Sequence, residues 1–212
     1  MKPKICFLIP AYGSIPLPAW QSHINLVAMA STFCQPFVLT SSMCYIHECR
    51  NDLVRKFLKV DKEEKFDYAF WLDSDIVFNY KDVKALLDEM VEKDKVLASG
   101  LYFNDFTKPN GKKDFVPMVC DYDKKLDGYK IHAKEEKESL VVDSAGFGFV
   151  CMRSDVLKKL VEKFGRVFDY RTSKRGKMIG EDNLFFERAR ELGFGCWFVP
   201  SVRTGHAKTF VL

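Results

Sequence analysis

Short apolar segments alternate with amphipathic segments along the first half of this 212-residue chain, and this alternation most constrains its fold. Apolar runs of strand length are separated by stretches whose apolar residues recur at helical spacing. We expect strands at 4–9, 37–40, 68–72 and 96–102, and helices at 20–32, 47–58 and 82–92. Strands that are joined through helices pair in parallel, with the helices on the faces of the sheet. The sequence therefore predicts an α/β fold built on a mostly parallel sheet.

The second half of the chain has shorter apolar runs and more polar connections. We expect a loop at 104–113, short antiparallel strands at 115–122, 129–133 and 140–142, a solvated charged connection at 134–138, and core strands at 146–152 and 196–199. Helices are expected at 155–163, capped by Ser154, and at 181–192, after a basic loop at 169–180. These segments add a small antiparallel β extension. The length suits one domain over 1–212, either complete or the N-terminal part of a longer protein.

Charge and cysteine content narrow the class of protein. The net charge of +4 predicts neither nucleic-acid binding nor a membrane-surface protein. No apolar run approaches the about 20 residues of a membrane-spanning helix. The seven cysteines are odd in number and lack Cys-x-x-Cys spacing, so reduced thiols are favoured over disulfides or a zinc site. These features indicate a cytoplasmic protein.

Two carboxylates follow the strand expected at 68–72, in the sequence Trp71-Leu72-Asp73-Ser74-Asp75. If the strand continues, its alternation places Asp73 and Asp75 on the same face. Converging carboxylates repel each other unless a cation lies between them. Hard divalent cations take oxygen ligands and also hold phosphate oxygens. The pattern indicates a metal site, and the alternative is a polar turn in which both acids are solvated.

Other candidate residues lie at strand ends and helix starts, where α/β sheets bind ligands. Pro10-Ala11-Tyr12-Gly13 follows the first strand, Arg50-Asn51 opens a helix where a cation and an amide can meet a nucleotide, and Gly146 to Gly148 begin a strand. Glu181 and Asp182 open another helix, and we expect the N-terminus of this helix to keep the Asp182 carboxylate ionised near neutral pH. Simple capping is the alternative to catalysis. For Arg50 the alternative is a surface position. His206 is a candidate third metal ligand or a structural histidine.

Five motifs, in this order, carry a resemblance: Ile9-Pro10-Ala11-Tyr12, Cys49-Arg50-Asn51-Asp52, Trp71-Leu72-Asp73-Ser74-Asp75, Ala145-Gly146-Phe147-Gly148 and Gly180-Glu181-Asp182. They resemble nucleotide-sugar-dependent glycosyltransferases of the GT-A fold over nearly the whole chain. The late Glu-Asp helix and the closing histidine resemble the inverting, metal-dependent members, including virus-encoded ones that build capsid glycans. For a virus-encoded member, the cytoplasm would be that of the host cell. The resemblance implies a Rossmann-like, mostly parallel sheet flanked by helices. The Trp-rich acceptor loop of larger members is not evident, which leaves the acceptor open.

The resemblance also implies a role for each motif. Residues at the nucleotide sugar would be Pro10, Ala11, Tyr12, Arg50, Asp73, Ser74, Gly146 and Phe147. Asp75 and His206 would hold a metal that bridges the diphosphate, with Asp73 facing the metal or the ribose. Asp182 would be the catalytic base, with Glu181 as the alternative. Mixed oxygen and imidazole ligands favour Mn²⁺ over Mg²⁺, and the basic residues Arg171, Lys174, Arg175 and Lys177 are candidates for a lid over the phosphates.

The implied reaction moves a hexose or deoxyhexose from a UDP-sugar to a hydroxyl of a glycan or glycoprotein, with inversion. Two alternatives stay open at this point. Asp73-Ser74-Asp75-Ile76-Val77 also fits the motif of haloacid-dehalogenase-like phosphatases, in which Asp73 would be the nucleophile. That family usually places the motif on its first strand, whereas two strand-helix units precede it here. The other alternative is a non-catalytic module that binds a nucleotide sugar.

Overall fold

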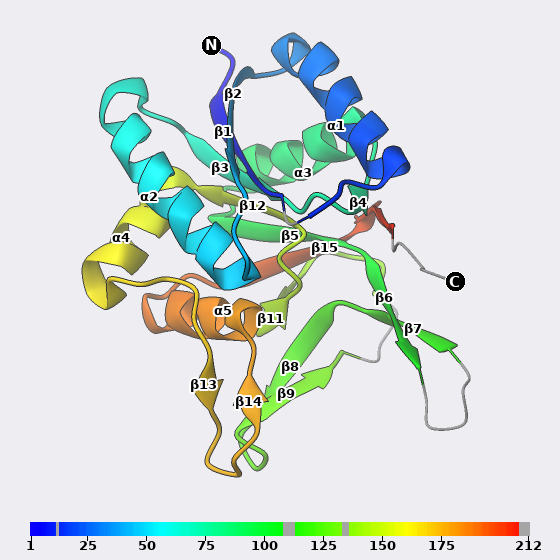
Figure 1. The fold of residues 1–212 in the computed structure, drawn as a ribbon, viewed down its shortest axis with the longest axis vertical. Helices are drawn as coiled ribbons and strands as arrows, with labels where there is room; N and C mark the ends of the chain where they lie inside the picture. The colour runs from blue at the N-terminus through cyan, green and yellow to red at the C-terminus, as the bar shows by residue number, and fades with distance from the viewer. Residues whose placement is uncertain (12, 108–112, 133–135, 208–212) are drawn as a thin grey trace.

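The computed structural model describes residues 1–11, 13–107, 113–132 and 136–207, and its main feature is a seven-stranded sheet (Figure 1). In spatial order the strands are β10 (Leu140–Val142), β15 (Cys196–Arg203), β5 (Leu97–Leu101), β12 (Phe149–Arg153), β3 (Tyr68–Leu72), β1 (Lys4–Pro10) and β2 (Gln35–Ser41). All run in one direction except β10 and β12, which are antiparallel to their neighbours. The expected α/β class is confirmed.

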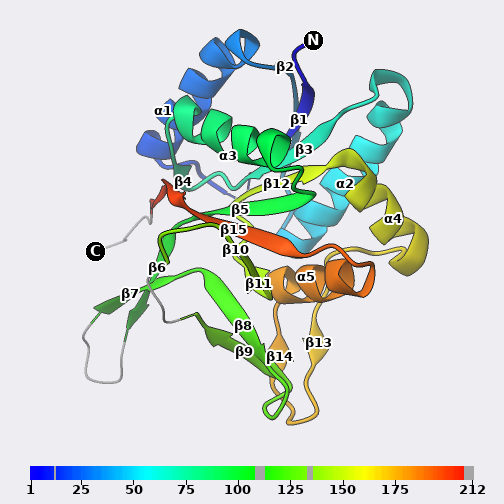
Figure 2. The same ribbon diagram turned by 180° about the vertical axis from the view of Figure 1, so that it is seen from behind.

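Helices cover both faces of the sheet (Figures 1 and 2). α1 (Leu17–Met29), followed by a 3-10 turn at Ala30–Thr32, and α3 (Tyr80–Glu92) lie on one face; α2 (Ile46–Glu64), α4 (Ser154–Phe164) and α5 (Glu181–Glu191) lie on the other. Each face has its own apolar layer. Leu26 and Leu86 belong to the first layer, and Phe57, Leu157 and Phe185 belong to the second. The sheet separates these layers because both of its faces are apolar.

Four small antiparallel units extend the fold. β8 (Val119–Asp123) pairs with β9 (Gly128–Ile131) and with β11 (Ser144–Ala145). The other units are the pairs β6 (Phe103–Thr107) with β7 (Lys113–Pro117), β13 (Arg171–Thr172) with β14 (Met178–Ile179), and β4 (Ile76–Val77) with β16 (Gly205–His206). Figures 1 and 2 show the β8–β9 and β13–β14 hairpins projecting at the same end of the molecule.

Local structure differs from the sequence-based expectation at three places. Residues 103–107 and 113–117 form a β-hairpin where a loop was expected up to 113, and residues 108–112 lie outside the described ranges. The segment 169–180 is a hairpin as well. A two-stranded ribbon lacks a fully buried face, so its sequence lacks the apolar alternation that marks a strand. Ser154 is the first residue of α4 and provides no side-chain cap, because Arg153 is the N-cap residue.

Helix starts and lengths follow identifiable contacts. α3 begins two residues before the expected position because Asn79 and Asp82 form a reciprocal capping box. α2 continues to Glu64, six residues beyond the expected end, and closes with Lys65 in the left-handed conformation. The expected charged connection at 134–138 lies partly outside the described ranges. Within the ranges that are described, no helix has the length and apolar character needed to cross a bilayer.

Candidate active site

A cleft of about 590 Å³ opens where β1 and β3 end. This is the edge at which parallel strands of an α/β sheet usually bind ligands. Pro10 ends β1, and Asp73, Ser74 and Asp75 follow β3. The remaining lining residues are Ser14, Pro16, Cys44, Tyr45, Ile46, Tyr170 and Ala207. The cleft therefore collects residues from five separate parts of the chain, including four of the predicted site residues.

Asp73 and Asp75 occupy a turn and not a strand. β3 ends at Leu72, and the N–H of Ile76 donates to the carbonyl of Asp73 at 3.2 Å. The expectation that strand alternation would align the two acids is therefore wrong, although both line the cleft. The N–H of Asp73 donates to the carbonyl of Gly148 at 3.0 Å, so the residue that precedes β12 fixes the start of the turn.

Asp75 and His206 come together through the pairing of β4 with β16. His206 lies opposite Ile76, and the N–H of Ala207 donates to the carbonyl of Asp75 at 2.8 Å. The imidazole Nε2 is 2.9 Å from a carboxylate oxygen of Asp75. One oxygen and one nitrogen thus converge beside the cleft, a donor set that Mn²⁺ accepts.

The third predicted metal ligand, Asp73, points elsewhere. Its carboxylate accepts from Nη2 of Arg50 at 3.0 and 3.3 Å. In the part of the chain that the structure describes, no group of three or more His, Cys, Asp or Glu is arranged to hold a metal. Sites that share a divalent ion with substrate phosphates commonly use only one or two protein carboxylates. The Asp75–His206 pair fits a metal of that shared kind.

Arg50 is the centre of an acidic cluster. Only 2% of its surface is exposed, which excludes the surface position considered above. Nη1 donates to Glu181 at 3.1 Å and to Asp182, and Nη2 donates to Asp73. Burial alone would lower the pKa of Arg50, but the three carboxylates outweigh it and raise the pKa. Three negative charges around one positive charge leave the cluster net negative if all are ionised.

Asp182 is held at the start of α5 by two donors. One oxygen accepts from Arg50, and the other accepts from the N–H of Phe147 at 3.3 Å. Burial raises the pKa of Asp182 to about 7, Arg50 opposes the shift, and Glu181 and Asp73 add to it. The helix N-terminus was expected to keep this carboxylate ionised, but burial is the larger effect. A pKa close to neutral suits a general base.

The Gly146-Phe147-Gly148 segment contributes backbone to the site. The ring of Phe147 is fully buried against Phe168 and Phe185, with centroids 4.8 and 4.6 Å away, so it packs in the core. The Cζ of Arg50 lies 5.1 Å from its centre. A Cβ on Gly146 would overlap the hydroxyl of Tyr102. Only glycine fits at position 146 without a shift of its neighbours.

Tyr102 is a residue that the sequence analysis missed. It is buried, and its hydroxyl accepts from the N–H of Gly148 at 3.3 Å. Burial and the charges of Asp182 and Asp73 raise its pKa well above the usual value, so the hydroxyl stays protonated. Tyr102 directly follows β5, and the rule that sites gather at strand ends could have identified it.

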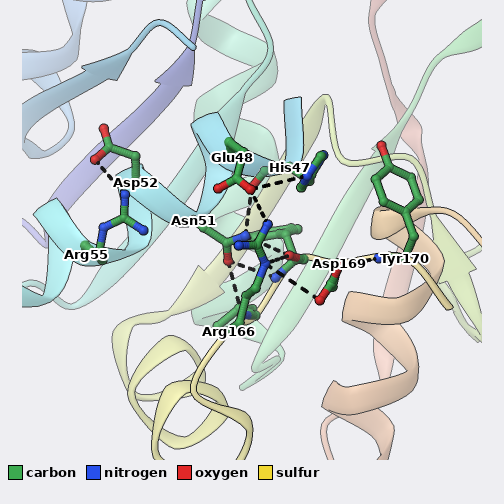
Figure 3. Close-up of polar contacts among 10 residues, drawn as sticks. His47, Glu48, Asn51, Asp52, Arg55, Arg166, Asp169 and Tyr170 are labelled. Atoms are coloured by element: carbon green, nitrogen blue, oxygen red, sulfur yellow. Dashed lines mark hydrogen bonds and ion pairs between the residues drawn. The ribbon is translucent and has the colours of Figure 1, made fainter. Parts of the chain in front are cut away.

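Asn51 binds backbone and not a ligand (Figure 3). Its side-chain NH₂ donates to the carbonyl of Phe168 at 2.7 Å, and its oxygen accepts from the N–H groups of Val167 and Phe168. Arg166 pairs at 2.6 Å with Glu48, which lies in α2 together with Asn51. These bonds attach the segment that carries Tyr170 to α2. The side-chain amide of Asn51 therefore contacts backbone groups, whereas the sequence predicted a contact with a nucleotide.

Aromatic side chains line one side of the cleft. Tyr45 and Tyr170 are both exposed, and the ring of His47 lies between them, with centroids 5.7 and 4.9 Å away. No spacing pattern marks Tyr45 or Tyr170 as site residues, because both lie in irregular segments. Tyr12 lies outside the described residues. Ala11 donates its N–H to the carbonyl of Ser41 at 2.8 Å, which ties the end of β1 to the end of β2.

The basic segment before α5 does not cover the cleft. Arg171 pairs with Glu187 at 2.8 Å and with Asp127 at 3.3 Å. None of the four basic residues considered for a lid lines the cleft. They lie on or beside the β13–β14 hairpin, which extends away from the main sheet (Figure 1).

Comparison with known proteins gives a likeness of fold. No protein-family model and no curated protein matches the chain. Among solved structures, A197 from STIV has a TM-score of 0.51 and 20% sequence identity, covering 99% of this chain and 96% of that one. GalNAc-T7, crystallised with UDP, GalNAc and Mn²⁺, has a TM-score of 0.56 and 9% sequence identity. The match covers 99% of this chain and 44% of the GalNAc-T7 chain. This chain therefore spans less than half the length of GalNAc-T7 and shares its GT-A-like fold.

Proposed function

We propose that this chain is a metal-dependent glycosyltransferase that moves a sugar from a UDP-sugar to an acceptor hydroxyl with inversion. The observation that carries the proposal is the gathering of acids at one edge of the sheet. Asp75 meets His206 at the cleft, and Arg50 joins Asp73 to Asp182. Support for the donor comes from GalNAc-T7, which has the same type of fold and was crystallised with UDP and Mn²⁺.

The donor is assigned to the cleft at the ends of β1 and β3. Pro10, Ala11 and Tyr12 would contact the nucleobase and ribose, and Ser74, which also lines the cleft, would contact the nucleotide sugar. Asp75 and His206 would hold Mn²⁺, with Mg²⁺ as the alternative. When bound, the ion neutralises negative charge that develops on the leaving diphosphate. Gly146 and Phe147 would form the floor beneath the sugar through their backbone, because the side chain of Phe147 is buried.

Arg50 takes a different role from the nucleotide contact that the resemblance implied. Its guanidinium donors are directed to Asp73, Glu181 and Asp182. We assign it to ordering these acids, because three unpaired carboxylates in a buried site would repel one another. Its charge also favours the ionised form of Asp182, which is the form that accepts a proton.

Asp182 is the proposed base. It removes the proton of the acceptor hydroxyl while the hydroxyl oxygen forms a bond to the anomeric carbon. The bond between that carbon and the diphosphate oxygen breaks, and UDP leaves with the electron pair. A direct displacement on the face opposite the leaving group inverts the anomeric configuration. Glu181, which shares Arg50 with Asp182, is the alternative base.

A donor panel tests this function. The purified chain is mixed with individual UDP-hexoses and UDP-deoxyhexoses, with Mn²⁺ or with a chelator, and with glycan or glycopeptide acceptors. We expect UDP release that requires the metal, and a product whose anomeric configuration is inverted by NMR. Binding of a UDP-sugar without UDP release in any mixture would indicate a binding module instead. Hydrolysis of a simple phosphate ester, together with fluoride-complex trapping on Asp73 and no UDP-sugar turnover, would indicate a phosphatase.

A further inference from the structure

Five exposed basic residues gather at the tips of two hairpins. Lys124 and Lys125 lie in the turn between β8 and β9, and Lys174, Arg175 and Lys177 lie between β13 and β14. Within the described ranges, none of the five forms an ion pair with a carboxylate. A single exposed lysine or arginine needs no functional explanation. Five unpaired cations on two adjoining tips form a local positive surface.

The two tips are fixed to each other by Asp127. One carboxylate oxygen accepts from the N–H of Lys174 at 2.7 Å, and the other accepts from the hydroxyl of Tyr122 at 2.7 Å and from Arg171 at 3.3 Å. The bond from Lys174, followed by that from Tyr122, lowers the pKa of Asp127 to about 2. Asp127 is therefore ionised and engaged throughout the neutral range, and it holds the positive surface together. Both views of the fold show the tips meeting (Figures 1 and 2).

The β8–β9 hairpin also carries a concave surface. A depression of about 680 Å³ is lined by Tyr122, Lys124, Lys125, Lys130 and His132, with Asp121, Asp123 and Ile131. The two acids in it are already paired, Asp121 with His132 at 2.8 Å and Asp123 with Lys130. Lys124 and Lys125 are left to bind an anion. A tyrosine face beside ammonium groups is a surface that a sugar ring with acidic substituents can occupy.

This surface belongs to the same structural unit as the proposed base. β14 leads through Gly180 into α5, whose second residue is Asp182, and Tyr170, which lines the cleft, precedes β13. Lys177 and Asp182 are five positions apart in the chain, a span of at most about 18 Å. Tyr129 of β9 donates its hydroxyl to the carbonyl of Asn183 in α5 at 3.2 Å, which anchors the other hairpin to the same helix.

We propose that the hairpin tips bind an acidic glycan acceptor, one that carries carboxylate, sulfate or phosphate groups, and direct its hydroxyl towards Asp182. This inference rests on the proposed glycosyltransferase function. Arg175 can make two parallel hydrogen bonds to such a group, and the lysines act as point charges. Nucleic acids and anionic membranes also bind positive surfaces, but both hairpins are attached to α5, the helix that carries the proposed base, and this connection favours a glycan.

The test compares two variants that each lose three positive charges. The hairpin variant is Lys174→Gln/Arg175→Gln/Lys177→Gln, and its control is Lys59→Gln/Lys62→Gln/Lys81→Gln, at exposed lysines without ion pairs in the described chain. The probe is a fluorescent heparin hexasaccharide, and the comparison is its desulfated counterpart, which is less acidic because it keeps only the uronate carboxylates. We expect the wild type to prefer the sulfated form, and the hairpin variant to lose about tenfold in affinity while the control changes less than about twofold.

Three results would overturn the inference: equal binding of the sulfated and desulfated probes, equal losses in the two variants, or tighter binding of a short single-stranded DNA or of phosphatidylserine vesicles than of the glycan. Release of UDP from donor and water alone is measured in parallel. If the wild type neither releases UDP in this way nor transfers sugar, the proposed function is wrong. If it releases UDP normally but does not prefer acidic glycans, only the acceptor inference is wrong.

Discussion

At the scale of single residues, one buried guanidinium holds three carboxylates that would otherwise repel one another. Arg50→Met keeps an apolar stem but removes the charge, and we expect it to lower the free energy of unfolding by about 3–5 kcal/mol at neutral pH. Arg55→Met, at an exposed position of the same helix, should change it by no more than about 0.5 kcal/mol. Urea unfolding measures both values. Equal losses in the two variants would contradict the role assigned to Arg50.

The pH dependence of that loss has a definite sign. Burial already raises the pKa values of Asp73 and Asp182, and removing Arg50 raises them further. Protonated carboxyls no longer repel, so the deficit of Arg50→Met should shrink as the pH falls through about 7 and grow as it rises. A deficit that grows on acidification would contradict this electrostatic explanation.

Asp182→Asn tests the base. The amide keeps the size of the side chain but cannot take a proton, so turnover should fall by about 10²–10⁴ while the donor still binds. In the wild type, kcat/KM should decline as the pH drops through about 7, because the base must be ionised. Initial rates of UDP release over a pH series measure both. Glu181→Gln is the matched control, and a larger loss there would move the base to Glu181.

Sequence reasoning at this scale found residues and one of their pairings, but not the others. His206 and Asp75 lie 131 positions apart, and their proximity was expected because a carboxylate pair lacked a third ligand. The contacts of Arg50 could not be anticipated, because its carboxylates come from separate elements whose relative placement depends on packing. The pKa of Asp182 was misjudged for the same reason, since burial is a property of the folded chain.

At the scale of elements, Asn51 attaches the segment before β13 to α2. Asn51→Ala leaves two backbone N–H groups and one carbonyl without their partner, and we expect it to destabilise the protein by about 2–3 kcal/mol. Asn51→Asp keeps the acceptor for both N–H groups and should lose less. Thermal unfolding gives the ranking. Equal stability of wild type and Asn51→Ala would show that this attachment is unimportant.

The close approach of Gly146 to Tyr102 gives a second test at this scale. A Cβ at Gly146 would lie 2.6 Å from Cζ of Tyr102 and 2.9 Å from Cβ of Met118, so Gly146→Ala should destabilise by about 1–3 kcal/mol. Gly180→Ala is the matched control, because a Cβ there meets nothing within 4 Å. If both substitutions are equally tolerated, the backbone at Gly146 has room that the structure does not show.

Elements with a strong apolar pattern were the predictable ones. The buried strands at Lys4–Pro10 and Tyr68–Leu72 and the helix around Phe57 were expected from periodicity alone. The β13–β14 hairpin was missed because its polar, basic sequence has no buried face to reveal it. The antiparallel insertion of β12 between β3 and β5 was also not expected, since a strand's direction within a sheet leaves no mark on its own sequence.

At the scale of the whole molecule, the fold gathers the proposed donor and acceptor functions at one edge of the sheet. The cleft and the Asp75–His206 pair lie at the ends of β1 and β3, and the hairpins are attached to α5 and β11. Alternation of strands and helices predicted this architecture. The architecture does not determine the substrates, because one fold supports many chemistries.

The most direct test of the central claim is a calorimetric titration of UDP into the protein with Mn²⁺ and with a chelator. We expect binding only with Mn²⁺, strong loss of that binding in Asp75→Ala and weaker metal affinity in His206→Ala. The control Asp88→Ala, at a partly exposed position of α3, should behave as the wild type. Equal binding of UDP in the chelator, or full Mn²⁺-dependent binding by Asp75→Ala, would contradict the claim that this cleft holds a nucleotide through a shared metal.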